Sequence, residues 1–157
     1  MKKGIRLILS ILVCELIGIS GSFFTIASIS TWYRTLNKPF FSPPNWIFGP
    51  VWAILYLMMG ISAYLIWAEG LKKKKVKEAL LFFAVQLILN FSWSLIFFGL
   101  QLPFSAFINI VTLWLAILAT ILRFNKISKT AGYLLIPYIL WVSFASVLNL
   151  AIVILNK

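Results

Sequence analysis

Aromatic and amide side chains recur at intervals of three or four residues in three apolar stretches of the sequence. Such intervals place residues on one face of an α-helix. The sets are Trp52 and Tyr56; Gln86, Asn90, Trp93 and Phe97; and Tyr138, Trp141, Ala145 and Asn149. Aromatic rings stack on flat apolar ligands, and amides bond to a ligand's polar edge, so these sets are typical of a binding pocket.

Each of these residues also has a purely structural interpretation. Amides inside a membrane bond between helices, and tryptophans anchor helices at the lipid headgroups. Counted at roughly 1.5 Å per helical residue, however, the sets gather in one half of the membrane, and Trp141 lies near its middle. We therefore expect one pocket for a flat apolar ligand, with Arg34 or Lys38 of a nearby loop available to the ligand's polar edge.

The sequence holds few residues for conventional catalysis or metal binding. It has no histidine, one cysteine at position 14, and three acids, Glu15, Glu69 and Glu78. Histidine is the commonest metal ligand and the commonest general acid or base near neutral pH. Neither a metal site nor an acid–base constellation is expected.

Lipid is expected to surround most of this chain. Of its 157 residues, 62% are apolar and 11% are charged, whereas soluble domains have roughly half and a quarter. Five apolar runs are each long enough to cross a bilayer, which takes about 20 helical residues. They are residues 5–29, 50–68, 78–98, 104–122 and 130–155. The predicted fold is an all-α integral membrane protein, a five-transmembrane-helix bundle in one domain over residues 1–157.

The first apolar run is expected to stay in the protein as a helix. A secretory signal peptide is the alternative, because Lys2 and Lys3 precede the run. The run is longer than a signal core, and no cleavage pattern of small residues follows it promptly.

The charges predict the orientation in the membrane. The 14 basic residues fall between the apolar runs, which argues against nucleic-acid binding. With five spans, 11 of them share one face, and Arg34, Lys38 and Lys157 lie on the other. The positive-inside rule then predicts a multi-pass cell membrane protein with a cytoplasmic N-terminus. The lysines at 72–77 have a second interpretation, the binding of anionic lipid headgroups.

Residues 30–49 are too rich in proline to cross the membrane. Their aromatic side chains suit the headgroup zone, so we expect them to cover the pocket as a lid. Glu15 lies within the first span, and an acidic residue inside a membrane is a candidate functional residue. The simpler interpretation is a protonated carboxyl that forms a hydrogen bond between helices. Pro137 removes an N–H and is expected to kink the last span, either for packing or as a bent pocket wall.

Three longer motifs of this chain follow one another in a familiar order. They are Trp32-Tyr33-x-x-Leu36-x-Lys38-Pro39 leading through Pro43-Pro44-x-Trp46 to Gly49-Pro50-Val51-Trp52; Gln86-x-x-Leu89-Asn90-x-x-Trp93; and Pro137-Tyr138-x-x-Trp141. The sequence thereby resembles the TspO/MBR family, the tryptophan-rich sensory proteins and translocator proteins, over nearly its whole length.

The resemblance implies a five-helix bundle, commonly a homodimer, that binds porphyrins such as protoporphyrin IX, together with sterols and benzodiazepine-type drugs. Trp52 and Trp141 match two tryptophans that the family places against the porphyrin and implicates in its breakdown by light and oxygen. Other pocket positions that match are Tyr33, Asn90, Trp93 and Ala145.

One stretch departs from the animal members of the family. Residues 148–155 lack the tyrosine and the basic residue of their cholesterol motif, so high-affinity cholesterol binding is not expected. Together with the charge bias, this makes the chain resemble a bacterial member.

Three functions fit these expectations. The first is a receptor or sensor that binds tetrapyrroles, with the porphyrin as ligand and no required cofactor. The second is light-dependent oxidative degradation of the porphyrin, with Trp52 and Trp141 as the catalytic residues. The third is transport of porphyrins or other lipophilic ligands.

Overall fold

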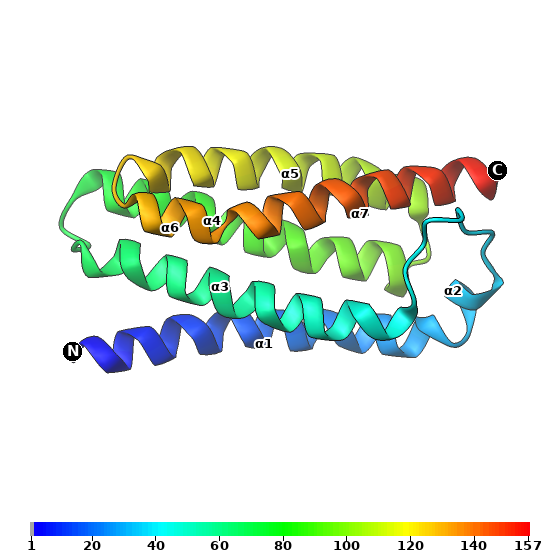
Figure 1. The fold of residues 1–157 in the computed structure, drawn as a ribbon, viewed down its shortest axis with the longest axis horizontal. Helices are drawn as coiled ribbons and strands as arrows, with labels where there is room; N and C mark the ends of the chain where they lie inside the picture. The colour runs from blue at the N-terminus through cyan, green and yellow to red at the C-terminus, as the bar shows by residue number, and fades with distance from the viewer. Residues whose placement is uncertain (1) are drawn as a thin grey trace.

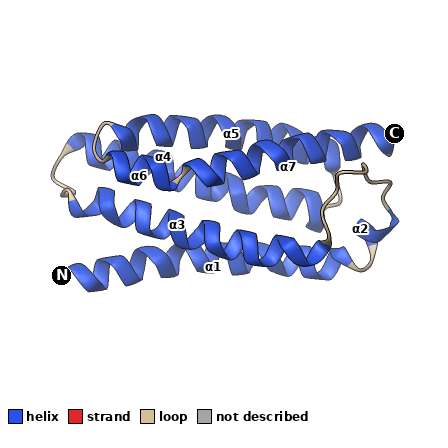
Figure 2. Ribbon diagram, viewed as in Figure 1, coloured by secondary structure: helices blue, strands red, loops and turns tan. Residues whose placement is uncertain are grey.

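The computed structural model describes residues 2–157, and within that range the chain forms helices and turns without a strand. Five of its helical segments are long and apolar enough to cross a membrane. The predicted all-α membrane bundle of five spans is confirmed. Figures 1 and 2 show the spans side by side along one long axis.

The helices, in chain order, have the following bounds. They are α1 Lys3–Ile29, α2 Trp32–Thr35, η1 Asn45–Ile47, α3 Phe48–Ala68, α4 Lys74–Ser94, η2 Leu95–Gly99, α5 Pro103–Asn125, α6 Lys129–Leu134 and α7 Ile136–Leu155. The segment η1 is a 3-10 turn that runs into α3, and η2 is a π-helix that continues α4.

All five spans start one to four residues earlier than the sequence prediction. The second span begins at Phe48, so Pro50 falls in its first turn, where the missing N–H has no helical partner to lose. The third begins at Lys74 instead of residue 78. Lysine favours helices, and Lys74 lies 3.8 Å from Glu78 one turn further on, so the basic run extends the helix outward.

The last span is broken near Pro137, as predicted. The break falls at Leu135, between α6 and α7. Proline has no N–H to donate back to the carbonyl of residue 133, so the helical ladder is interrupted at this point. The two pieces then pack differently: α6 lies against α3 and α5, whereas α7 packs mainly against α5.

Small residues on two helices bring α1 and α3 close together. A Cβ added at Gly60 would lie 2.5 Å from the Cα of Ile11, and one at Gly18 would lie 2.5 Å from the ring of Tyr56. Gly18 on α1 and Gly60 on α3 therefore allow these two helices to pack closely within the chain. These contacts fix α3 as the neighbour of α1 along the bundle.

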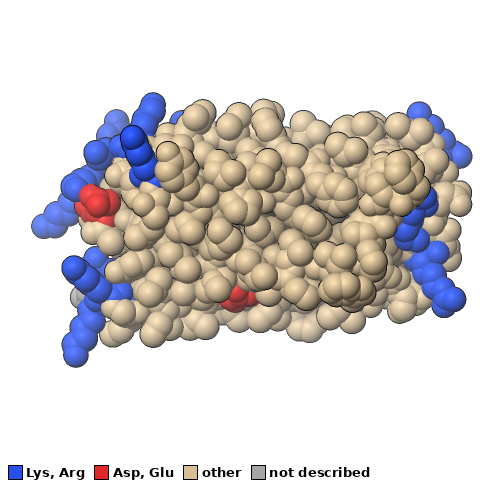
Figure 3. All heavy atoms as spheres, viewed as in Figure 1, with Lys and Arg blue, Asp and Glu red and all other residues tan. Residues whose placement is uncertain are grey.

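The charged side chains lie at the two ends of the bundle. Figure 3 shows Lys and Arg at both ends and a largely uncharged band between them. We call the end that holds residues 2–6, 69–78 and 123–129 the basic end, and the end that holds residues 30–44 the loop end. The uncharged band is the part that a bilayer would cover.

Candidate functional site

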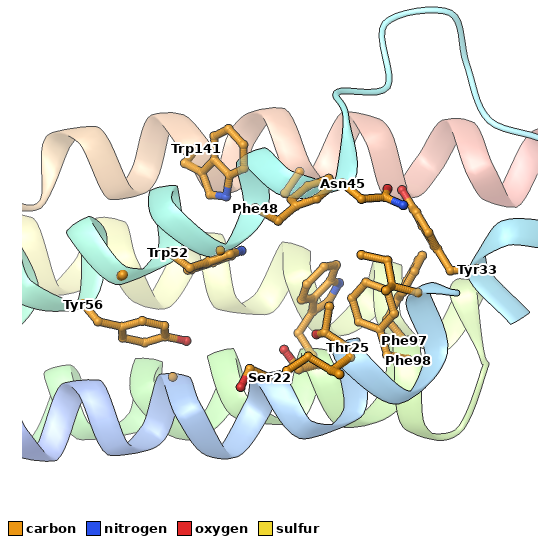
Figure 4. Close-up of a pocket in the computed structure, with 18 of the residues that line it drawn as sticks. Ser22, Thr25, Tyr33, Asn45, Phe48, Trp52, Tyr56, Phe97, Phe98 and Trp141 are labelled. Carbon is orange, nitrogen blue, oxygen red and sulfur yellow. The ribbon is translucent and has the colours of Figure 1, made fainter. Parts of the chain in front are cut away.

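A cavity of about 490 Å³ lies in the loop-end half of the bundle. Its walls come from α1, the start of α3, the end of α4 with η2, and α7 (Figure 4). Helix α5 contributes no lining residue. The volume is in the range of pockets for drug-sized ligands and cofactors.

Most of the predicted site residues line this cavity. They are Tyr33, Trp52, Tyr56, Trp93, Phe97, Trp141, Ala145 and Asn149. Three indoles, Trp52 from α3, Trp93 from α4 and Trp141 from α7, thus face one space and do not fan out into lipid. The sequence had placed these residues on three separate helices, and the fold brings them together.

Aromatic rings join α3 to α7 across the bundle. The ring centroids of Phe48 and Trp141 are 6.1 Å apart, and those of Trp52 and Tyr138 are 6.3 Å apart. Helix α7 packs mainly on α5, so these rings bridge the space between α7 and α3. This space is lined by flat faces suited to stacking on a flat ligand.

The π-helix brings two adjacent aromatic residues into the wall. Phe97 and Phe98 both line the cavity, and the ring of Phe97 stacks on that of Trp93 at 5.3 Å. In an α-helix, adjacent residues point about 100° apart, and a π turn alters that register. Phe98 was not predicted, because a local i→i+5 turn leaves no mark on hydrophobic spacing.

Hydrogen bonds hold the indole of Trp93 in place. Its Nε1 donates to Oδ1 of Asn149 at 3.0 Å, and Nδ2 of Asn149 donates to the carbonyl of Pro103 at 2.9 Å. Asn149 therefore both lines the cavity and ties α4 to the start of α5. In contrast, Nε1 of Trp141 is buried without a partner in the described chain, so its N–H is free for an acceptor on a ligand.

Two predicted pocket residues lie outside the cavity wall. Asn90 and Tyr138 are buried next to it, in a network that also contains Tyr56 and Gln86. The hydroxyl of Tyr56 donates to Oδ1 of Asn90, Nδ2 of Asn90 donates to the hydroxyl of Tyr138 at 2.7 Å, and that hydroxyl donates to Oε1 of Gln86 at 2.7 Å. The amide of Asn90 is thus bonded between helices, which is the structural interpretation that the sequence left open. Asn90 therefore affects the site indirectly, because its hydrogen bond holds the side chain of Tyr56 in the cavity wall.

Several lining residues escaped the sequence prediction. Many of them lie on α1, in η1 and at the start of α3, including Glu15, Gly18, Ser22, Thr25, Asn45 and Phe48. Glu15 was considered only as an acid within the first span, and Gly18 and Ser22 had no predicted role in the site. The residues of α1 in this set are three or four positions apart, which places them on one face of the helix. That spacing was the available signal that this face could form a cavity wall opposite the aromatic helices.

The first loop closes the loop end of the cavity through α2 and η1. Tyr33 is 2% exposed and lines the cavity near Asn45 (Figure 4). Burial raises the pKa of Tyr33, with the side chain of Ser42 acting in the opposite direction, so the phenol stays neutral near neutral pH. Arg34 and Lys38 do not line the cavity. Nζ of Lys38 donates to the carbonyl of Leu36 at 3.2 Å and lies 4.8 Å from the ring centroid of Tyr33.

The same loop is tied to the end of the last helix. The backbone N–H of Asn37 donates to Oδ1 of Asn156 at 2.9 Å, and Nδ2 of Asn156 donates to the carbonyl of Asn37 at 2.9 Å. We call this pair of bonds the latch. It joins residues 119 positions apart in the sequence.

The site offers stacking surfaces and single polar groups rather than a catalytic constellation. Within residues 2–157, no three His, Cys, Asp or Glu side chains gather as a metal ion would require. The groups that could react with a ligand or bind its polar atoms are the indoles, the free N–H of Trp141 and the carboxyl of Glu15.

Comparison with known proteins matches nearly the whole chain to one family. The sequence profile of the TspO/MBR family covers residues 10–155. "Tryptophan-rich protein TspO" of Chlorobaculum tepidum is 46% identical over 155 residues, which cover 99% of this chain and 98% of that protein. "Tryptophan-rich protein TspO" of Archaeoglobus fulgidus is 47% identical over 97% of both chains. "Translocator protein" of Homo sapiens is 38% identical over 82% of this chain and 77% of its own length.

Proposed function

This chain belongs to the TspO/MBR family, and from that premise we propose that it is a membrane receptor that binds a tetrapyrrole such as protoporphyrin IX in the aromatic cavity. The observation that carries the proposal is the convergence of Trp52, Trp93 and Trp141 on one cavity. A tetrapyrrole is flat, largely apolar and polar at its edge, which matches a site of ring faces with few polar groups.

Titration with protoporphyrin IX tests the proposal. Saturable quenching of tryptophan fluorescence is expected for the wild-type protein in lipid nanodiscs. Trp141→Ala should weaken binding about tenfold or more, because it removes a stacking face and the free N–H. Trp67→Ala is the matched control: Trp67 lies near the basic end, outside the cavity. Unchanged affinity in Trp141→Ala, or equal losses in both variants, would contradict the proposed site.

We further propose that the bound porphyrin is degraded oxidatively under light, with Trp52 and Trp141 as the participating residues. The supporting observation is that both indoles line the cavity, and indoles are among the side chains most readily oxidised. Light and dioxygen would supply the oxidising power. Illumination of the complex should yield less product in Trp52→Phe than in the wild type, and an unchanged yield would rule out the role of Trp52.

Transport of the same ligand is the alternative function. It is favoured by the exposure of two lining residues on the outside of the bundle: Ile26 is 68% exposed and Trp46 is 74% exposed. A lipophilic ligand would then enter sideways from the bilayer. Proteoliposomes should move porphyrin faster than empty vesicles if the protein transports it, and equal rates would exclude transport.

A further inference from the structure

Glu15 is the only carboxyl group among the described residues that line the cavity. The two other acids of the chain lie at the basic end and are paired there: Glu69 is 3.3 Å from Lys73, and Glu78 is 3.8 Å from Lys74. Glu15 has no such partner within residues 2–157. It is a half-buried acid in the middle of a membrane-spanning helix.

Among residues 2–157, no basic side chain forms an ion pair with this carboxyl. Of the two basic residues on the same helix, Lys3 and Arg6, Arg6 is the nearer, and nine helical residues separate it from Glu15 by about 13 Å along the axis. The guanidinium of Arg6 lies over the ring of Trp67, 5.7 Å from its centroid. An ionised carboxylate inside the membrane is costly unless a cation accompanies it.

The α1 wall is more polar than the other walls of the cavity. Glu15, Ser22 and Thr25 lie on the face of α1 that lines it. In Figure 4 the labelled hydroxyl residues of α1 lie across the cavity from Phe48 and Trp141. A ligand stacked on the aromatic side therefore presents one edge to α1, with Glu15 at the end nearest the basic end.

We propose that Glu15 is a ligand contact that gives the cavity a preference for flat aromatic molecules carrying a protonated amine. The ammonium group would supply the cation that the protein does not, and the flat body would stack on the indoles. The amine lies at the inner end of the cavity, and any anionic edge points toward the loop end. This inference rests on the proposed function for the cavity itself and adds the chemical class of ligand.

Two matched probes test this preference: 1-pyrenemethylamine, which is cationic, and its N-acetyl derivative, which has the same four rings and no charge. Binding is measured in nanodiscs of zwitterionic phosphatidylcholine, with empty nanodiscs as the blank for partitioning. The wild type should bind the amine about tenfold more tightly than the amide. Glu15→Gln should lose the preference and bind the two probes equally. Glu69→Gln, at the basic end, should keep the wild-type preference.

The outcomes separate this inference from the proposed function. If the wild type binds protoporphyrin IX but shows no preference for the amine, or if Glu15→Gln keeps the preference, the role of Glu15 is wrong and the receptor proposal stands. If the preference depends on Glu15 but protoporphyrin IX does not bind, the proposed ligand is wrong and the carboxyl contact stands. If neither pyrene binds, the inference fails. Should Glu15→Gln not fold, Glu15→Asp, which keeps the charge on a shorter arm, should show a reduced preference, and a full wild-type preference in it would contradict direct contact.

Discussion

At the scale of single residues, the polar groups beside the cavity hold the aromatic ones in position. Asn90 shows this well, since its amide bonds to the phenols of Tyr56 and Tyr138 and so connects three helices. A buried polar group is stabilising only while its partners are present. The rigidity of Tyr56 in the cavity wall therefore depends on residues that no ligand touches.

Tyr138→Phe should lower stability, because it leaves Nδ2 of Asn90 and Oε1 of Gln86 without their shared partner. We expect a loss of about 1–2 kcal/mol, measured by thermal unfolding in detergent. Tyr133→Phe is the control, since Tyr133 is 64% exposed. Equal melting temperatures for the two variants would show that the network does not contribute to stability.

Gly60→Ala should push α1 and α3 apart. The added Cβ would meet the Cα of Ile11, which is backbone and cannot rotate away. We expect a loss of about 1–3 kcal/mol in unfolding free energy, whereas Gly4→Ala, where a Cβ meets nothing within 4 Å, should be neutral or slightly stabilising. A Gly60→Ala protein as stable as Gly4→Ala would mean that the two helices are not in close contact.

At the scale of elements, the first loop and the last helix act as one unit at the loop end. The latch pairs the backbone of Asn37 with the side-chain amide of Asn156, which also donates to the carbonyl of Ile152. Tyr33 and Asn45, on either side of the latch in the loop, both line the cavity. Motion of this loop away from α7 would open the cavity at this end.

Asn156→Ala should speed ligand exchange, because it removes both bonds of the latch. We expect the dissociation rate of protoporphyrin IX to rise several-fold, measured by stopped-flow fluorescence after dilution into empty nanodiscs. Lys157→Ala changes the neighbouring residue without touching the latch and should leave the rate unchanged. A wild-type rate in Asn156→Ala would show that the loop is held by its other contacts.

The elements differ in how far the sequence alone could predict them. The five spans follow from run length and apolar content, because a bilayer fixes the length of a helix. The break before Pro137 follows from the missing N–H of proline. The π turn at η2 could not be predicted, since an i→i+5 turn leaves no signal in the hydrophobic spacing. The position of Asn90 outside the cavity wall could not be predicted either, because the residues that hydrogen-bond to its amide lie on other helices.

At the scale of the whole molecule, the charge distribution defines two unlike ends. The basic end carries 11 of the 14 basic residues, and the loop end carries Arg34, Lys38 and Lys157. Since the positive-inside rule acts on short loops such as these, the basic end is expected in the cytoplasm. The cavity would then open in the outer half of the membrane.

Cysteine labelling tests that orientation. In a Cys14→Ser background, a cysteine introduced by Thr35→Cys should react with a membrane-impermeant maleimide added to intact cells, because position 35 lies in the first loop. Lys126→Cys, at the basic end, should react only after the cells are opened. The reverse pattern would place the cavity in the cytoplasmic half.

The latch also has a consequence for biosynthesis. Its two halves are 119 residues apart, and Asn156 directly follows the last of the five spans. Until that part of the chain has been synthesised, the nascent polypeptide lacks the α7 wall and the anchor for its first loop, even when the earlier spans have already entered the bilayer. The cavity is therefore completed only after α7 has joined the other four spans.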